Sequence, residues 1–329
     1  MRPQPIRARP MRAQSAVALG GGHGLHASLH ALRRLVDDLV LDDLTAVVTV
    51  ADNGGSSGRL RGEFGVLPPG DLRMALAALT RADAWGRTWE SVVQHRFEGD
   101  GEMRGHVVGN LLIVSLWELL GDHVEALQLM GRLLGTTGRV LPMALTPMDI
   151  TAEVRGLDPA DPGATQTVRG QVAVATTEGQ IVSVALDPAD PEACPEAVEA
   201  VHDADWVVLG PGSWFTSVIP HLMVPALREA LGKTTARVVV VLNLAPQAGE
   251  TGGFGPEDHL AALLEHAPGL KVHTVLVDPG SLTGVDELER TVAAYVARLV
   301  VDDVALGDGT PRHDPAKLAR AYASIFEDG

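Results

Sequence analysis

Short apolar runs alternate with amphipathic stretches along most of the chain. The β-branched run at residues 45–50 is typical of a buried strand. Further strand patterns occupy residues 17–19, 205–210, 236–243 and 271–277. Between and after them, apolar residues recur at helical spacing at residues 25–36, 71–79, 225–231, 257–266, 286–298 and 314–326. This alternation predicts an α/β fold with a Rossmann-like, doubly wound and mostly parallel sheet.

A different pattern interrupts this alternation at about residues 85–190. Two further helices are predicted at residues 107–120 and 124–134. Antiparallel strands are then predicted at residues 150–156, 167–176 and 180–186, with turns near Asp158 and Glu178. We therefore expect one domain over residues 15–329 with an inserted helical and antiparallel β section. An Arg-rich and Pro-rich stretch at residues 1–14 is expected to be a disordered leader.

Composition narrows the classes of partner. The net charge of −16 argues against non-specific binding to nucleic acid, which needs a basic surface. No run of 18 apolar residues occurs, so no membrane span is expected. Cys194 is the single cysteine, which excludes an intramolecular disulfide and favours a cytoplasmic location.

The first predicted strand ends in a turn that is unusually rich in glycine, with Gly20, Gly21, Gly22 and Gly24. Glycine lets a backbone approach a ligand closely, and the first N–H groups of a helix attract an anion. Such a turn is suited to phosphate, although it can also be merely tight. Leu25 stands where the dinucleotide-binding pattern Gly-x-Gly-x-x-Gly would need its third glycine, and no P-loop Gly-Lys-Ser/Thr follows.

Three other loops that follow predicted strands are also rich in glycine, hydroxyls or amides. They cover residues 51–61, 210–217 and 243–251. The second resembles another anion cradle, with Ser213 as helix N-cap and Pro220 ending a short helix. Because ligands bind beyond the carboxyl ends of parallel strands, these loops predict one crevice for a phosphate-bearing ligand. They add as candidate ligand-binding residues Asp52, Asn53, Ser56, Ser57, Arg59, Gly210, Gly212, Ser213, Thr216, Ser217 and Asn243.

The loop at residues 51–61 has two alternative roles for its first carboxylate. Asp52 can bind a Mg²⁺ ion that bridges phosphates, or it can cap the loop or pair with Arg59. Residues 54–58 also match Gly-x-Ser-x-Gly, the pattern of serine hydrolases. We reject that interpretation, because a nucleophile elbow needs a strand that ends at the serine and a helix that starts just after it.

The remaining candidate side chains lie on predicted helices. Asp71 opens the helix at residues 71–79. His106 and Asn110 lie one turn apart, and the Asn110 amide can hold a base or sugar edge or tie its helix to the sheet. The twelve histidines form no His-Glu-x-x-His, and no Cys-x-x-Cys occurs, which argues against a zinc site.

Taken together and in order, seven segments resemble the gluconeogenesis factor family, also called YvcK or CofD-like. They read ALGGGHGL, TVADNGGSSGRLR, PPGDLRMALAAL, GHVVGNLL, VLGPGSWFTSVIPHLMVP, LNLAPQAGETGGF and RHDPAKLA. The similarity extends over about residues 15–325, nearly the whole chain. A distant relative of the family is 2-phospho-L-lactate transferase (CofD) of coenzyme F420 synthesis.

The resemblance implies a cytoplasmic protein that binds nucleotide sugars such as UDP-N-acetylglucosamine. It also implies a link to cell shape, peptidoglycan synthesis and growth on gluconeogenic carbon sources, with cell-wall synthesis proteins as partners. No firm reaction is attached to the family, whereas its transferase relatives use Mg²⁺ and move a phospholactyl group onto a deazaflavin. The resemblance does not decide between a monomer and a homodimer.

Some positions match the family and others depart from it. Arg312 matches, and by resemblance it meets the diphosphate of the ligand. His23 stands where many relatives have threonine, and Asn53 where many have aspartate. Pro315 stands where some relatives have a threonine that could be phosphorylated.

Two hypotheses follow. The first is a regulatory protein that binds a UDP-sugar or related nucleotide diphosphate, with the diphosphate across the two glycine turns and Asn110 and Asn243 on the base or sugar. The second is a Mg²⁺-dependent transferase with Asp52 on the metal, for which the sequence offers neither a pair of carboxylates nor a general base. The first is favoured. A dinucleotide oxidoreductase is disfavoured by the glycine spacing.

Overall fold

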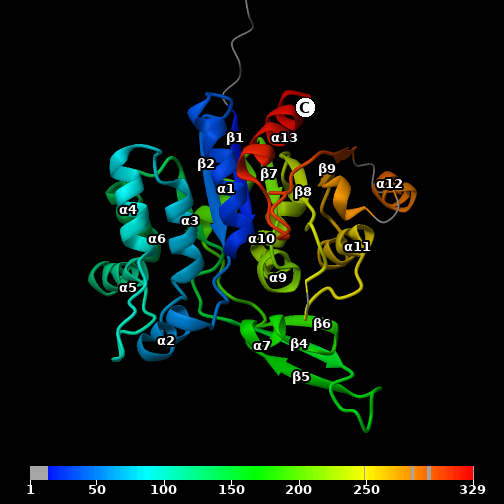
Figure 1. Cartoon of the computed structure of the whole chain (residues 1–329), viewed down its shortest axis with the longest axis horizontal. Coiled ribbons are helices and arrows are strands. Elements are labelled where there is room, and N and C mark those ends of the chain that lie inside the picture. Colours follow the sequence, from blue (N-terminus) through cyan, green and yellow to red (C-terminus); the bar gives the residue numbers. More distant parts are fainter. Residues whose placement is uncertain (1–13, 248, 283–284, 295–297, 329) are drawn as a thin grey trace, which may run out of the picture.

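The centre of the protein is a parallel sheet. The computed structural model describes residues 14–247, 249–282, 285–294 and 298–328. Within them, seven strands pair in the order β10-β9-β8-β7-β1-β2-β3, and every neighbouring pair is parallel (Figure 1). The strands are β1 (Ser15–Gly20), β2 (Asp43–Val48), β3 (Arg139–Pro142), β7 (Trp206–Leu209), β8 (Arg237–Val241), β9 (Val272–Val277) and β10 (Arg298–Val301). The predicted α/β fold class is confirmed.

The sequence analysis did not predict the two edge strands of the sheet, β3 and β10. Both β3 and β10 are four residues long. A strand this short, with only part of its surface buried, carries too few positions for a clear pattern. The single helix expected at residues 286–298 is wrong, since α12 ends at Ala294 and β10 begins at Arg298.

Two groups of helices cover the sheet. Helix α1 (Gly22–Asp37) contacts both α3 (Gly70–Leu79) and α13 (Pro315–Asp328). A second contiguous group comprises α8 (Pro195–Asp203), α9 (Ile219–Met223), α10 (Pro225–Lys233), α11 (Pro256–His266) and α12 (Val285–Ala294). Strand order runs in opposite directions on either side of β1, and crossovers are right-handed, so the two groups lie on opposite faces. This is a doubly wound arrangement.

The inserted section divides into a helical part and a small sheet. Helices α4 (Ala84–Gln94), α5 (Val108–Leu120) and α6 (His123–Leu134) pack together, whereas β4 (Asp149–Arg155), β5 (Thr165–Arg169) and β6 (Gln180–Asp187) form an antiparallel sheet that projects from the body (Figure 1). The strand expected at residues 167–176 ends at Arg169. Gly170 has φ +96°, and a short helix, α7 (Gln171–Ala175), follows it.

The loop after β2 also differs from expectation, because residues 55–64 form a helix, α2 (Gly55–Phe64). The strand β2 ends at Val48, well before Ser56, so the arrangement is still not a nucleophile elbow.

The expected leader lies outside the described residues except for Gln14. The Gln14 side chain accepts a hydrogen bond from Trp206 Nε1 at 3.1 Å. Trp206 in turn stacks on Phe326 of α13, with ring centroids 4.4 Å apart. Across the described part of the chain, no helix is both long enough and apolar enough to cross a bilayer.

Candidate functional site

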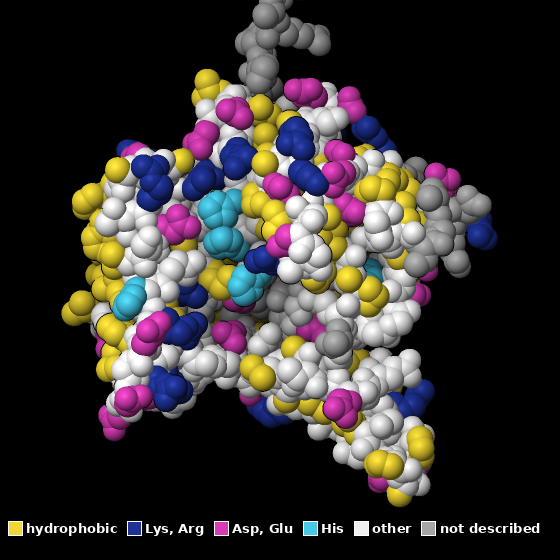
Figure 2. Space-filling view, in the orientation of Figure 1, with side chains coloured by type: hydrophobic (Ala, Val, Ile, Leu, Met, Phe, Trp, Pro, Cys, Tyr) yellow, Lys and Arg dark blue, Asp and Glu magenta, His cyan; other side chains and the backbone are white. Residues whose placement is uncertain are grey.

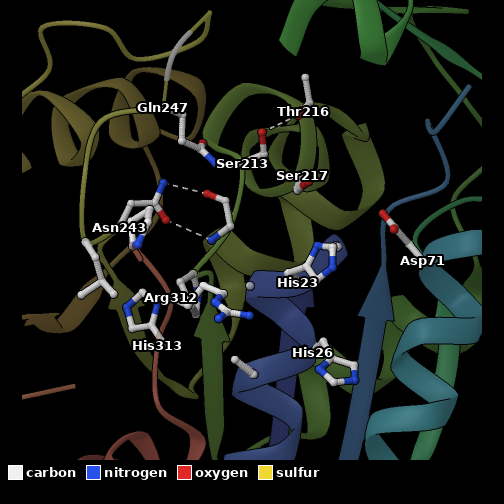
Figure 3. Close-up of a pocket in the computed structure, with 18 of the residues that line it drawn as sticks. His23, His26, Asp71, Ser213, Thr216, Ser217, Asn243, Gln247, Arg312 and His313 are labelled. Carbon is white, nitrogen blue, oxygen red and sulfur yellow. Dashed lines mark hydrogen bonds between the residues drawn. The ribbon is translucent and has the colours of Figure 1, made fainter. Parts of the chain in front are cut away.

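A cavity of about 1000 Å³ opens at the carboxyl edge of the parallel sheet. Its wall combines the turn after β1, the loops after β7 and β8, and the segment before α13 (Figure 3). Its size is at the upper end of the range for small-molecule sites. Of the candidate residues, the wall contains Gly21, Gly22, Gly24, Asp52, Asp71, Gly212, Ser213, Thr216, Ser217, Asn243 and Arg312.

The first glycine turn places the start of α1 at this cavity. Gly22 has φ +58°, a conformation that other residues adopt only with strain, and a Cβ there would meet nothing within 4 Å. At Gly24, a Cβ would lie 2.3 Å from the carbonyl oxygen of Pro211. The first turn is therefore open to the cavity at Gly22 and packed against the second turn at Gly24.

The second glycine turn is held by Asn243. The Asn243 Oδ1 atom accepts from the Gly212 N–H at 3.1 Å, and its Nδ2 donates to the Gly212 carbonyl at 2.8 Å (Figure 3). This pair of hydrogen bonds makes Asn243 a residue that positions the turn.

Glu250, which the sequence analysis did not single out, organises the residues that follow this turn. It is 5% exposed and accepts hydrogen bonds from the Ser213 hydroxyl, from Thr216 Oγ1 at 2.6 Å and from the Phe215 N–H at 2.9 Å. Ser213 occupies the N-cap position, as expected, but its hydroxyl is bound to Glu250 and makes no capping hydrogen bond to a backbone N–H.

The expected end of the helix after this turn is also wrong. Residues Trp214–Val218 form one π-helical turn, and Pro220 stands in the first turn of α9. A proline is accepted there because the first N–H groups of a helix have no partner within it.

Replacing Glu250 with alanine is expected to destabilise the protein by about 2–3 kcal/mol, because three donors would lose a buried carboxylate acceptor. Urea unfolding followed by circular dichroism measures the change. Glu199→Ala, at an exposed position of α8, is the matched control. Equal midpoints for the two variants would contradict the role of Glu250.

Two carboxylates, Asp52 and Asp71, lie on the cavity wall. Burial, and after it the nearby charge of Asp52, raise the pKa of Asp71 to about 7, against the opposing effects of a hydrogen bond from the Gly22 N–H and of the charge of Arg73. The expectation that no carboxylate pair is present is therefore wrong. Carboxylate oxygens are ligands that suit Mg²⁺, so the residues fit a Mg²⁺ ion.

Of the alternatives for Asp52, the structure shows the loop cap. Its Oδ1 accepts from the Gly54 N–H at 2.8 Å. Arg59 does not pair with it, and instead donates to the carbonyls of Glu102 and Arg104. Because Asp52 also lines the cavity, capping and metal binding are compatible.

His106 and Asn110 are brought together away from the cavity wall. Ser56 Oγ lies 3.3 Å from His106 Nδ1 and accepts from Asn110 Nδ2 at 3.1 Å. Asn110 Oδ1 accepts from Arg73 Nε at 2.9 Å. The expected tie from Asn110 to the sheet is wrong in its partner, since the hydrogen bonds of this side chain join α5 to α2 and α3. Burial lowers the pKa of His106.

Other candidates also lie off the cavity wall as the described residues define it. Asn53 Oδ1 accepts from the Val172 N–H at 3.0 Å and so caps α7. The remaining members of this group are Gly20, Ser57, Arg59 and Gly210.

Arginine and histidine side chains complete the cavity wall. Arg312 lines the cavity and binds Asp308 at 2.8 Å, and Arg34 lines it from α1. The sequence analysis missed Arg34, His26 and His30, which lie at four-residue spacing on the face of α1 that begins at Gly22. That spacing is the signal that could have found them. Histidine side chains gather beside the hollow (Figure 2).

The sheet and this cavity define a Rossmann-like α/β protein with its binding cleft at the carboxyl edge of the sheet. Residues 16–307 match the family described as 2-phospho-L-lactate transferase CofD. A relative from Mycobacterium tuberculosis (strain H37Rv) is 53% identical over 312 residues, covering 94% of this chain and 89% of that protein. The "Gluconeogenesis factor" of Bacillus subtilis (strain 168) is 35% identical over 325 residues, covering 94% of this chain and 97% of that protein.

The solved structures agree with the sequence comparisons. A crystal structure of a Bacillus halodurans protein, described as a member of the UPF0052 family, has a TM-score of 0.82 and 33% identity, and the match covers 95% of this chain and 99% of that one. The chain belongs to the CofD family, among the relatives named gluconeogenesis factors. The family inferred from the seven motifs is confirmed.

Proposed function

We propose that the cavity binds a nucleotide diphosphate sugar of the UDP-N-acetylglucosamine type. The observation that carries this proposal is the contact between the two glycine turns at Gly24 and Pro211, which brings both turns to one wall. A diphosphate would lie across them, with one phosphate at the first N–H groups of α1, where it would replace Asp71 as the acceptor for the Gly22 N–H.

Charges around the cleft both favour and oppose the binding of a diphosphate. The positive end of the α1 dipole, Arg34 and Arg312 favour an anion, whereas Asp52 and Asp71 oppose it. A neutral Asp71 would remove part of that opposition, and so would a Mg²⁺ ion between the carboxylates and the phosphates.

A regulatory role agrees with the names of the relatives, which refer to gluconeogenesis rather than to a reaction. We infer a cytoplasmic protein whose bound state is transmitted to cell-wall synthesis proteins and so to cell shape and growth on gluconeogenic carbon sources. This inference rests on the family resemblance.

A second candidate function is Mg²⁺-dependent transfer at a nucleotide diphosphate linkage. It is favoured by the pair of carboxylates at the cavity and by the description of the matching family as a transferase. Asp52 and Asp71 would hold the Mg²⁺ ion, which would supply charge stabilisation to the phosphates.

Isothermal titration with UDP-N-acetylglucosamine, with and without Mg²⁺, tests the first proposal. Arg312→Glu should weaken binding about tenfold or more, equivalent to about 1.4 kcal/mol, because it replaces a cation at the cleft with an anion. Arg320→Glu, at an exposed position of α13, makes the same charge change and should leave affinity unchanged. Failure of the wild type to bind with or without Mg²⁺ would refute the proposal.

The same samples separate the two candidates. Binding without Mg²⁺ and without loss of ligand supports a regulator. Mg²⁺-dependent consumption of a nucleotide diphosphate substrate, followed by chromatography, would favour the transferase.

A further inference from the structure

Two histidines of α1 and a glutamate of α4 form a cluster at the edge of the cavity. His26 and His30 lie one helical turn apart, and Glu90 approaches from the neighbouring helix bundle. One ligand atom from each of the three side chains lies within 4.8 Å of the other two. We propose that these residues form a Zn²⁺ site distinct from the Asp52 and Asp71 pair.

The state of the three side chains supports metal binding. All three are half-buried, and within the described ranges none of them has a hydrogen bond or an ion pair. Their ligand atoms are therefore not engaged within the described structure and can coordinate an ion. The two imidazole rings contact one another edge to face with centroids 4.5 Å apart, so a small rotation about their side-chain bonds can turn both toward one ion.

The chemistry of the set favours zinc over magnesium. Two imidazoles and one carboxylate are the ligands of zinc sites that keep one position open, whereas Mg²⁺ prefers oxygen ligands. Burial lowers the pKa of His26 to about 4 and that of His30 to about 3, so both rings are neutral at pH 7 and can donate a lone pair.

The surroundings oppose a cation in part. His23, Arg33 and Arg73 act on His26, and Arg33 and Arg34 act on His30. Glu90 supplies the compensating negative charge, and burial raises its pKa, so this carboxylate gains from a bound cation. The arginines are expected to reduce affinity rather than to abolish binding.

The position of the cluster would let a bound ion contact a molecule in the cavity. His26 and His30 both line the cavity, and Figure 3 shows His26 on α1 beside it. The fourth coordination position of the zinc would therefore face the cleft and take water or an anionic group. This site does not depend on which nucleotide the cleft binds.

The sequence motifs argued against a zinc site and could not indicate this set. The pair His26-x-x-x-His30 has metal-binding spacing, but it lacks the adjacent glutamate of His-Glu-x-x-His, and Glu90 is distant in the chain. The fold brings Glu90 to α1 through the packing of α4 in the inserted section.

Zinc titration of the full chain, stripped with EDTA and desalted, tests the proposal. Competition with a chromogenic chelator should show one equivalent of Zn²⁺ bound by the wild type. His30→Gln and Glu90→Gln should each weaken binding about tenfold or more, whereas His202→Gln, at an exposed position of α8, should not. Thermal unfolding in EDTA should show that all these variants fold as the wild type does.

Cobalt provides a second measurement, because four-coordinate Co²⁺ absorbs strongly in the visible range. The wild type should give this spectrum and His30→Gln should not. Failure of the wild type to bind Zn²⁺ would overturn the proposal. Binding that persists in His30→Gln and Glu90→Gln but is lost in Asp52→Asn would also overturn it, and would place the ion at the carboxylate pair.

Discussion

Replacing Asp71 with asparagine is expected to stabilise the protein at pH 8 by on the order of 4 kcal/mol, since a pKa difference of one corresponds to about 1.36 kcal/mol between two protonation states. The pKa of Asp71 rises from an ordinary value of 3.8 to about 7 in the folded protein, chiefly through burial. Asparagine has nearly the same shape and carries no charge, so it avoids the unfavourable burial of the carboxylate.

The pH dependence of this effect follows from the raised pKa of Asp71. Near pH 3 the carboxyl is protonated in both folded and unfolded chains, so it adds no pH-dependent difference. As the pH rises from about 4 to about 7, the unfolded chain releases its proton and the folded one retains it. Wild-type stability therefore falls over this range relative to Asp71→Asn, and the difference is constant above it.

Thermal unfolding of both proteins from pH 4 to pH 9 measures this difference. For Asp190→Asn, at an exposed position outside the cavity, the difference in stability from wild type should not increase with pH. A difference between Asp71→Asn and wild type that stays flat across the range would show that Asp71 is ionised normally.

The same substitution bears on the proposed ligand. Asp71 accepts a hydrogen bond from the Gly22 N–H, where the proposed phosphate would bind. Without Mg²⁺, Asp71→Asn should therefore bind a nucleotide diphosphate more tightly than wild type at pH 8. If the variant instead binds more weakly than wild type only when Mg²⁺ is present, the Asp71 carboxylate holds the metal.

Replacing Gly24 with alanine is expected to destabilise the protein by about 1–3 kcal/mol and to abolish ligand binding. The new Cβ would lie 2.3 Å from the Pro211 carbonyl oxygen and 2.6 Å from the Gly212 Cα. Both are backbone atoms, so the two glycine turns must move apart. The proposed diphosphate could then no longer contact both turns.

Gly62→Ala is the matched control for this substitution. Gly62 lies within α2, and a Cβ there meets nothing within 4 Å. Alanine should stabilise that helix by about 0.5–1 kcal/mol, the opposite sign from Gly24→Ala. Urea unfolding and ligand titration measure both effects, and normal binding by Gly24→Ala would contradict the proposed role of the paired turns.

Local sequence patterns were sufficient to predict the main parallel strands and most helices. The apolar runs that became β2, β8 and β9 are long enough to show their character without any knowledge of their neighbours, and the four residues of β7 are all apolar and buried. The same holds for the glycines of both turns, because positive φ and close backbone approach restrict the residue type at each position. The order of the seven motifs along the chain also predicted the family, which the comparisons confirm.

The pairing of distant side chains was decided only by the tertiary structure. Asp52 and Asp71 both line the cavity because the start of α3 lies against the loop after β2, where a Cβ on Gly70 would be 3.2 Å from Asp52 Oδ2. Glu250 reaches Ser213 from the loop after β8. Glu90 approaches His26 and His30 only through the fold of the inserted section. Local spacing determines which face of a helix or strand a residue occupies, but burial and charge in three dimensions determine what that residue meets and how it titrates.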